Sequence, residues 1–164
     1  MIVSAICFLI KKEGGCRMSD SGFWKKLETA RPGDSAPWSQ VLEHISWNAD
    51  SLIPAIAQQY DTREVLMLAW MNLAALKETL ESGRVCYWSR SRQQLWRKGE
   101  SSGQIQELRE MRFDCDGDTL LLLVDQTGPA CHTGRRTCFF NLAQGDKLMV
   151  DKPVLIDPKT LYGK

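Results

Sequence analysis

The stretch from Ile53 to Gly83, IPAIAQQYDTREVLMLAWMNLAALKETLESG, says most about the architecture of this 164-residue chain. Two apolar runs, Ile53 to Tyr60 and Glu64 to Met71, flank Asp61-Thr62-Arg63, and this pattern predicts two strands joined by a short turn. The second run also has a helical composition, since Glu, Leu, Met and Ala favour helix. The pattern alone therefore leaves strand and helix open for residues 64–71.

A helix is predicted directly after these runs, from Leu73 to Ser82. Asn72 is a good N-cap, because its side-chain oxygen can accept a hydrogen bond from a backbone N–H group of the first turn. Gly83 suits the left-handed residue that ends many helices. Three leucines fall on one face of this helix, which we expect to be its buried face: Leu73, Leu76 and Leu80.

Further strands are expected from Arg84 to Ser89, which is rich in aromatic residues, and from Leu120 to Asp125, a nearly unbroken apolar run. With one clear helix near residues 72–82, the sequence predicts an α+β, β-rich fold with a mixed or antiparallel sheet. Residues 11–39 carry no sustained apolar period. We therefore expect a flexible N-terminal tail over residues 1–37 and one folded domain over residues 38–158.

The overall charge is nearly balanced, with 21 basic and 20 acidic residues, so it gives no reason to expect a nucleic-acid or membrane partner. Met1 to Ile10 is apolar, but it lacks the preceding basic residues and the small-residue cleavage pattern of an export signal. We therefore expect a cytoplasmic protein. In that compartment the six cysteines stay reduced and free to bind metal.

Three of the cysteines lie close in sequence and could bind zinc. Cys131 and Cys138 flank a turn that contains Thr133-Gly134, and Cys115 comes just before the apolar strand that leads to them. One hairpin-like excursion could bring the three thiols together, and three thiolates leave a fourth tetrahedral position for water, as in catalytic zinc sites. Without a CxxC pair, buried core thiols or a disulfide explain the spacing equally well.

Asp114, Asp116 and Asp118 alternate along the chain. In an extended segment their carboxylates would point to one face and repel one another unless a cation joined them, and carboxylate oxygens suit magnesium. The spacing is similar to the opening of an EF-hand loop, but Gly117 falls at the fourth position instead of the sixth, so we reject a calcium loop. A solvated acidic turn is the simpler alternative.

Residues 84–98 carry five positive charges and no negative one, with Tyr87, Trp88 and Trp96 interleaved. Arginine forks bind phosphate and aromatic faces stack on bases, so this segment suits a nucleotide. An RNA-binding strand would look similar, and so would a solvated basic hairpin. The balanced total charge favours a small phosphorylated substrate over a polymer.

Taken in order, these motifs resemble the phosphoribosyl-AMP cyclohydrolase family of histidine biosynthesis. The resemblance covers roughly residues 52–142 and rests on the segments Trp88 to Arg92, Leu95 to Glu100 with Ser102-Gly103, Asp114 to Asp118, Gln126 to Gly128, Ala130 to Gly134, and Cys138 to Phe140. Thr137 stands where the family usually has Ser, a change that leaves the thiols in place.

The resemblance implies hydrolytic opening of the adenine ring of 1-(5-phosphoribosyl)-AMP at the C6–N1 bond, the third step of histidine biosynthesis. It implies zinc on Cys115, Cys131 and Cys138, magnesium on Asp114, Asp116 and Asp118, and a homodimer whose zinc ligands come from both chains. The substrate would contact Arg90, Arg92, Trp96 and Lys98 of the basic segment and Glu100 just after it.

The chemistry that we expect is zinc-assisted hydrolysis, in which a water of lowered pKa attacks an electron-poor ring carbon. His132 is the candidate catalytic proton shuttle, because it follows Cys131 and its unperturbed pKa lies near neutrality. A structural histidine that orients a zinc ligand is the alternative.

Two other classes of protein share some of these features. A zinc-dependent nucleoside deaminase would need His-x-Glu and Pro-Cys-x-x-Cys, and His132 is instead followed by Thr133-Gly134. A zinc-stabilised module that binds nucleotides or nucleic acid without catalysis would use the same thiols, with all four zinc positions closed by protein ligands.

Overall fold

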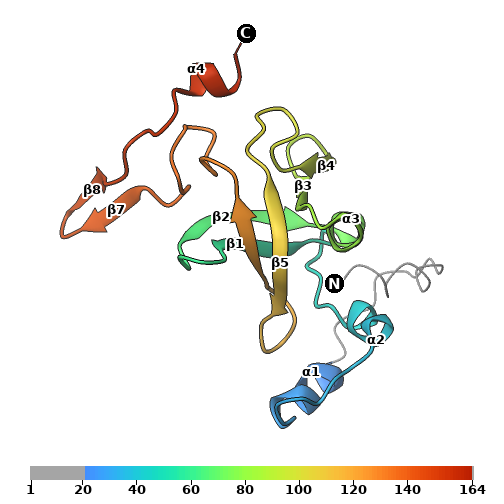
Figure 1. The fold of residues 1–164 in the computed structure, drawn as a ribbon. Coiled ribbons are helices and arrows are strands. Elements are labelled where there is room, and N and C mark those ends of the chain that lie inside the picture. Colours follow the sequence, from blue (N-terminus) through green and yellow to red (C-terminus); the bar gives the residue numbers. More distant parts are fainter. Residues whose placement is uncertain (1–20, 164) are drawn as a thin grey trace.

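The two apolar runs form the predicted hairpin. β1 (Ile53–Gln59) pairs with β2 (Val65–Met71) in antiparallel register, so the helical alternative for the second run is wrong. Their β-branched and aromatic residues suit a pleated sheet, and in β1 alternate residues are buried. The computed structural model, shown in Figure 1, describes residues 21–163.

Six strands form the main sheet in the order β4-β3-β2-β1-β6-β5. The remaining strands of this sheet are β3 (Cys86–Ser89), β4 (Gln94–Arg97), β5 (Gln106–Phe113) and β6 (Leu120–Gln126). β1 and β6 run parallel and the other neighbours run antiparallel, which confirms the predicted α+β fold with a mixed sheet.

The sheet is curled. Arg84 forms an isolated antiparallel bridge with Glu107, and the backbone N–H of Val85 donates to Gln106 O at 3.0 Å, so the start of β3 lies beside the start of β5. The inward residues of the central strands form the core together with the buried face of α3 (Leu73–Ser82). This curl brings the segment after β4, which contains Lys98, close to the end of β6 that precedes Cys131 and Cys138.

The predicted helix is confirmed as α3. The Asn72 side chain accepts a hydrogen bond from the backbone N–H of Ala75 at 2.9 Å, and Gly83 ends the helix with φ 71°. Leu76 and Leu80 are buried as predicted, but Leu73 is exposed, because Ala75 and Thr79 complete the buried face instead. The buried face is therefore rotated away from the first residue of the helix.

Two short helices precede the sheet, α1 (Ser21–Glu28) and α2 (Trp38–Glu43). We predicted a flexible tail over residues 1–37; its first 20 residues lie outside the described residues, and residues 21–28 are helical instead. The reason is Trp24, which is buried against Phe113 with 5.4 Å between ring centroids and donates from Nε1 to His44 O. The burial of one aromatic side chain thus explains why this mostly polar segment is helical.

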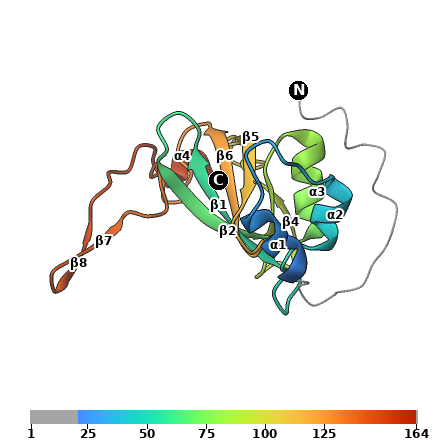
Figure 2. The same ribbon diagram turned by 90° about the horizontal axis from the view of Figure 1, so that it is seen from below.

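The chain ends with a separate two-stranded hairpin, β7 (Asn141–Gln144) and β8 (Lys147–Val150), followed by the short helix α4 (Pro158–Leu161). Figure 2 shows this hairpin projecting away from the main sheet. Within residues 21–163, none of the helices has the length and apolar character needed to cross a membrane.

Candidate metal and substrate site

The three aspartates of the DCDGD motif meet in the turn between β5 and β6. Ligand oxygens of Asp114, Asp116 and Asp118 lie within 4.8 Å of one another, and all three residues are exposed. They converge because the chain turns here, not because the segment is extended as we had assumed: Asp114 Oδ1 accepts the backbone N–H groups of Asp118 at 3.0 Å and Thr119 at 3.1 Å. The result is a small cage of hard oxygen donors.

Gly117 allows this turn to form. Its φ is +71°, and a Cβ atom there would lie 2.0 Å from the indole of Trp24, so the turn is both left-handed and pressed against α1. The Ser46 hydroxyl also donates to Asp116 O at 2.8 Å. The acidic turn is therefore held from outside by the N-terminal helices and the segment that follows them.

Electrostatics in the turn favour a bound cation. The Thr119 hydroxyl lowers the pKa of Asp118 through a hydrogen bond. The net shift is nevertheless upward, because a hydrogen bond with the Asp114 carboxyl, partial burial, and the charges of Asp114 and Asp116 all raise this pKa. Carboxylates crowded in this way repel one another, and a divalent cation would remove the repulsion. A hard divalent cation would suit this charge environment, and the oxygen donors fit such an ion.

Cys131 and Cys138 form a thiol pair beyond the other end of β6. The turn between them is closed by hydrogen bonds from the Cys131 N–H to Arg135 O at 3.1 Å and from the Gly134 N–H to Cys131 O at 3.0 Å. Cys138 is fixed to the sheet, because its N–H donates to Leu66 O at 2.7 Å. Burial of the Cys138 thiol, followed by the influence of the Cys131 thiol, raises the pKa of Cys138 to about 12. Two such thiols become thiolates near neutral pH when a cation such as zinc compensates their charge.

Lys98 lies beside this thiol pair. It is only 5% exposed, and its ammonium group lies 5.9 Å from the centre of the Trp96 ring. Burial lowers the pKa of Lys98, while the negative charges of Cys138 and Cys131, when ionised, act in the opposite direction. A buried ammonium next to two thiols can either balance thiolate charge or meet an anionic substrate group.

Cys115 does not join the other two thiols within one chain. It lies exposed in the acidic turn, whereas Cys131 and Cys138 follow the far end of β6. The seven residues of β6 separate these ends by roughly 20 Å at about 3.3 Å per residue. Within residues 21–163 the aspartate trio is the one group of three potential metal ligands whose atoms converge. The expectation that one hairpin-like excursion gathers all three thiols is therefore wrong for a single chain.

His132 is exposed and follows Cys131 directly, so it lies at the rim of the thiol pair. Thr133 donates from its hydroxyl to Cys131 Sγ at 3.1 Å. His132 is thus free to face solvent, a substrate or another chain, while its neighbour orients the thiol. Its position is compatible with both the shuttle and the structural alternatives.

The predicted substrate residues divide between two ends of the β3–β4 hairpin. Arg90 and Arg92 lie in its turn, where the Arg90 guanidinium stacks 4.8 Å from the Trp70 ring and Arg92 Nε donates to Ser89 Oγ at 3.2 Å. Lys98 and Glu100 follow the other end of β4, and Glu100 is exposed. Trp96 lies between them, half-buried and 5.6 Å from Tyr87.

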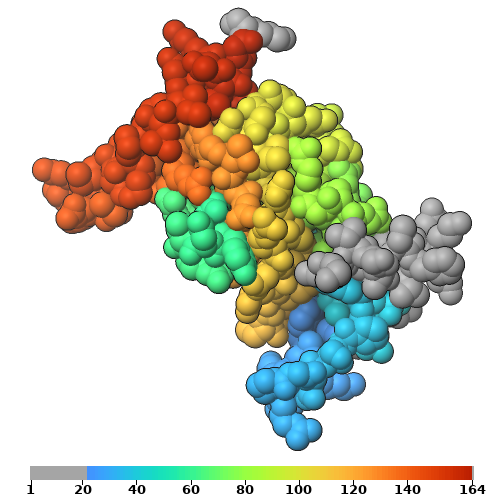
Figure 3. Space-filling model, viewed as in Figure 1, coloured from blue at the N-terminus to red at the C-terminus, as the bar shows by residue number. Residues whose placement is uncertain are grey.

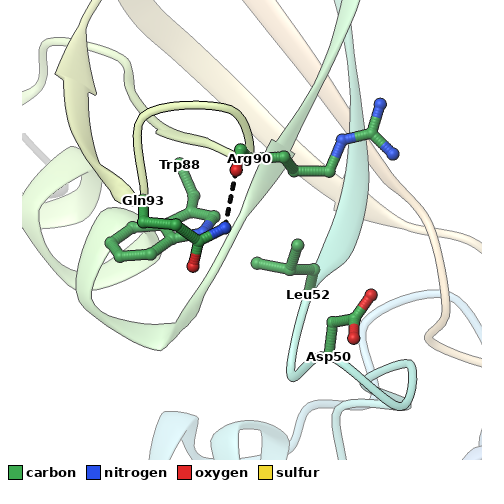
Figure 4. A pocket seen from close by; sticks show the side chains of 5 residues that line it. All are labelled: Asp50, Leu52, Trp88, Arg90 and Gln93. Atoms are coloured by element: carbon green, nitrogen blue, oxygen red, sulfur yellow. Dashed lines mark hydrogen bonds between the residues drawn. The ribbon is translucent and has the colours of Figure 1, made fainter.

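A hollow of about 270 Å³ adjoins the arginine turn. Figure 4 shows the side chains that line it, with the Gln93 amide donating to the backbone oxygen of Arg90 at 2.6 Å: Asp50, Leu52, Trp88, Arg90 and Gln93. Our sequence reasoning missed Asp50 and Leu52, because they come from the loop before β1 and no local pattern links them to the hairpin.

Arg136 is a second residue that the sequence did not reveal. Its guanidinium donates to Gly128 O at 3.0 Å and to Gln59 Oε1 at 2.7 Å, which fastens the thiol loop to the ends of β1 and β6. Gln59 Oε1 in turn accepts the N–H of Gln126 at 3.2 Å. The signal that could have found Arg136 is its place between the two thiols, although its partners are set by the tertiary fold.

Comparison with known proteins shows that this chain is similar to a class of hydrolytic enzymes. The similar proteins are each named phosphoribosyl-AMP cyclohydrolase. The family model of that name matches residues 67–140, which include the basic segment, the acidic turn and the thiol pair. This chain belongs to the phosphoribosyl-AMP cyclohydrolase family. The resemblance seen in its motifs is thereby confirmed.

The relatives match over almost their whole length. A protein from Halorhodospira halophila is 68% identical over 136 residues, covering 83% of this chain and 96% of the relative. One from Alkalilimnicola ehrlichii is 66% identical, covering 85% and 98% of the two chains. A third, from Hydrogenovibrio crunogenus, is 59% identical over 147 residues, covering 90% and 100%. The similarity therefore extends through the whole domain and beyond the motifs.

Proposed function

We propose that this protein hydrolyses the C6–N1 bond of 1-(5-phosphoribosyl)-AMP, which opens the adenine ring and yields the imidazole carboxamide nucleotide of the third step of histidine biosynthesis. The observation that carries the proposal is the family membership, at 68% identity to a relative of that name. The acidic turn, the thiol pair and the basic hairpin support it by supplying donor groups suited to the reaction.

The metals in this proposal are magnesium and zinc. Asp114, Asp116 and Asp118 would hold magnesium, and their converging oxygens fit that ion. Cys131 and Cys138 would hold zinc together with Cys115, and soft thiolates fit zinc. When bound, zinc would lower the pKa of a water molecule, which makes a nucleophile available near neutral pH.

The proposal includes the homodimer with a shared zinc site that the resemblance implies, and the distribution of the thiols supports it. The separation of Cys115 from Cys131 and Cys138 by β6 within one chain supports a third sulfur that comes from a second copy. A two-fold arrangement in which the acidic turn of one copy faces the thiol pair of the other would complete two equal sites.

The protein side chains have separate tasks in this scheme. Arg90 and Arg92 bind the substrate's phosphates as exposed forks at the hairpin turn, and Trp96 offers a face for the base. Lys98 and Glu100 contact the nucleotide near the thiol pair. His132 transfers a proton between the attacking water and the leaving N1 nitrogen.

The alternative is a zinc-stabilised module that binds nucleotides or nucleic acid without catalysis. No particular contact in the described residues favours it over an enzyme. It would require a fourth protein ligand in place of the zinc-bound water. A cytoplasmic location likewise stays a prediction.

The test is hydrolysis of phosphoribosyl-AMP by the purified chain, followed by the absorbance change of ring opening. We expect turnover in the presence of zinc and magnesium, loss of turnover after chelation, and recovery when both ions return. Zinc binding by a folded chain that shows no turnover would contradict the proposed function and favour the binding module.

A further inference from the structure

The hollow beside the β3–β4 turn combines a carboxylate, a guanidinium, an amide and two largely apolar side chains. Two of these come from the loop before β1 and three from the β3–β4 hairpin: Asp50 and Leu52, and Trp88, Arg90 and Gln93. Its volume is about 270 Å³. Pockets that enclose a whole drug-sized ligand measure about 300 to 1,000 Å³, so this hollow suits one part of a nucleotide.

The two charged groups at the hollow are not paired with each other. Figure 4 shows the Asp50 carboxylate and the Arg90 guanidinium apart from one another, on different segments of the chain. Among residues 21–163, neither group has an ion-pair partner. Both charges are therefore available to a ligand that carries an anionic group for the guanidinium and hydrogen-bond donors for the carboxylate.

The sheet holds the guanidinium beside the hollow. Trp88 in β3 is the register partner of Trp70 in β2, so the two indoles lie on the same face of the sheet. Arg90 follows two residues after Trp88, and its guanidinium lies 4.8 Å from the centre of the Trp70 ring. An arginine that stacks on a ring keeps the N–H groups at its edge for an anion.

The backbone on both sides of the hollow is left-handed at residues that seldom adopt that conformation. Ser51, between Asp50 and Leu52, has φ +58°, and Gln93 has φ +51°. These are two of the three non-glycine residues with positive φ within residues 21–163. Asn48 holds the first turn, because its Oδ1 accepts the N–H groups of Asp50 and Leu52, both at 2.9 Å. Backbone of this kind is concentrated at ligand-binding sites.

The loop that carries Asp50 also contacts the acidic turn. Ser46 Oγ donates to Asp116 O at 2.8 Å, and the Ser46 N–H donates to Gly117 O at 2.9 Å. Figure 3 shows the segment of α1, in blue, packed against the end of the molecule at which β5 turns into β6. One short loop therefore joins the hollow to the proposed magnesium site.

A pentose 5-phosphate has the groups that fit this hollow. Its phosphate suits the Arg90 guanidinium, its hydroxyl groups can donate to the Asp50 carboxylate, and the apolar face of its ring can pack on Trp88. An acidic side chain also binds the ribose hydroxyl in dinucleotide sites. Inorganic phosphate would leave the Asp50 carboxylate without a hydrogen-bond donor.

We propose that this hollow binds one ribose 5-phosphate unit of the substrate, with Asp50 recognising the sugar hydroxyls and Arg90 the phosphate. The inference rests on the proposed function, whose substrate carries two such units, one on N9 and one on N1 of the adenine ring. Asp50 is thereby the residue that distinguishes a ribosyl from a deoxyribosyl group.

The experiment measures the binding of ribose 5-phosphate and 2-deoxyribose 5-phosphate by calorimetry, with the full-length chain prepared with zinc and magnesium. Asp50→Ala should bind ribose 5-phosphate about tenfold more weakly than the natural chain, because a hydrogen bond to a charged group is lost. It should also lose the preference for ribose over deoxyribose. Asp50 is exposed and its turn uses its backbone N–H, which alanine keeps.

The matched control is Asp146→Ala, which removes the same charge at an exposed residue of the β7–β8 turn and should bind both sugars like the natural chain. Equal affinities of Asp50→Ala and Asp146→Ala for ribose 5-phosphate would overturn the proposal. A natural chain that does not bind this sugar phosphate, or does not prefer it to the deoxy sugar, would overturn it as well.

AMP distinguishes the two units of the substrate, because it carries only the one on N9. Weaker binding of AMP by Asp50→Ala assigns the hollow to the N9 unit, and unchanged binding of AMP with weaker binding of ribose 5-phosphate assigns it to the N1 unit. Turnover of phosphoribosyl-AMP by the natural chain is measured in parallel. Binding of ribose 5-phosphate that depends on Asp50, in a chain without turnover, refutes the proposed function and leaves the sugar-phosphate site standing.

Discussion

The two ends of β6 are built in opposite ways. At its start, the acidic turn gathers three carboxylates from five consecutive residues, and the chain's own backbone N–H groups hold Asp114 in place. Past its end, the thiol loop carries two sulfurs. Hydrogen bonds to Gln59 and Leu66, which lie far away in the sequence, hold this loop in place. One end gathers its three carboxylates within a turn, and the other has two thiols, with the third thiol of the proposed zinc site roughly 20 Å away in the same chain.

The two ends of β6 therefore differ in whether their proposed metal sites depend on assembly. A cluster made by one turn can bind its cation in a monomer, whereas a site that draws on two chains exists only in the assembly. The proposed shared zinc site would form only in the dimer, and the carboxylate site would be independent of assembly.

Mixing two inactive variants tests whether the zinc site spans two chains. Cys115→Ala and Cys138→Ala should each lose more than about a hundredfold in turnover, since removal of a direct ligand exceeds the usual loss from an outer partner. After dissociation and reassociation together, about a quarter of the natural turnover should return. Half of the dimers are then mixed, and each of these holds one intact site.

The control is a mixture of Cys131→Ala and Cys138→Ala. Both changes fall on the same loop, so mixed dimers keep no intact site and activity should stay absent. Recovery in this control as well, or no recovery in the first mixture, would show that the three thiols are not divided between chains.

His132→Ala tests whether the thiol end carries the proton transfer. We expect a loss of about a hundredfold or more in turnover with zinc content unchanged, because a positioned acid or base contributes about that much. Zinc per chain is measured alongside the rate. Thr160→Ala, in the exposed helix α4, should leave both quantities unchanged. Near-normal turnover of His132→Ala would leave the histidine a structural role.

Asp116→Asn tests the independence of the acidic end. It removes one carboxylate charge while keeping the size of the side chain, and we expect the affinity for magnesium to fall about tenfold. Calorimetric titration of zinc-loaded protein measures this, with Asp61→Asn in the β1–β2 turn as the control. The same loss should be seen in zinc-free protein, and a loss that depends on bound zinc would contradict the division between the ends.

Gly117→Ala and Gly83→Ala compare a glycine under contact with one in open space. Both have φ +71°, but an added Cβ meets the Trp24 indole at Gly117 and nothing within 4 Å at Gly83. Gly83→Ala should cost about 1 kcal/mol of unfolding free energy for the left-handed backbone, and Gly117→Ala at least about 1 kcal/mol more for displaced packing. Urea unfolding measures both, and equal costs would show that Trp24 does not support the acidic turn.

The same contrast explains what could be predicted from the sequence. The β1–β2 hairpin, α3 and the convergence of the aspartates follow from short-range patterns, such as the Asn72 cap and the spacing in DCDGD. The helix around Trp24 was missed because its stabilising partner, Phe113, lies far along the chain. The thiols were wrongly joined although the strand between them was predicted, because β6 runs extended through the sheet and its two ends lie roughly 20 Å apart.

The smallest effect expected concerns the ionisation of Cys138 in chelated protein. Its pKa in the folded chain is raised from 9.0 to about 12, first by burial and then by Cys131, so the folded state keeps a proton that the unfolded chain has lost. The contribution to stability is therefore fully present below about pH 9 and is lost as the pH rises toward 12. Cys138→Ser should reduce this fall in unfolding free energy by less than about 1 kcal/mol at pH 10, because the residue as a whole is exposed although its thiol is turned inward, and solvent screens part of the effect. Identical pH slopes for the two chains would show that the thiol pair is not formed before metal binds.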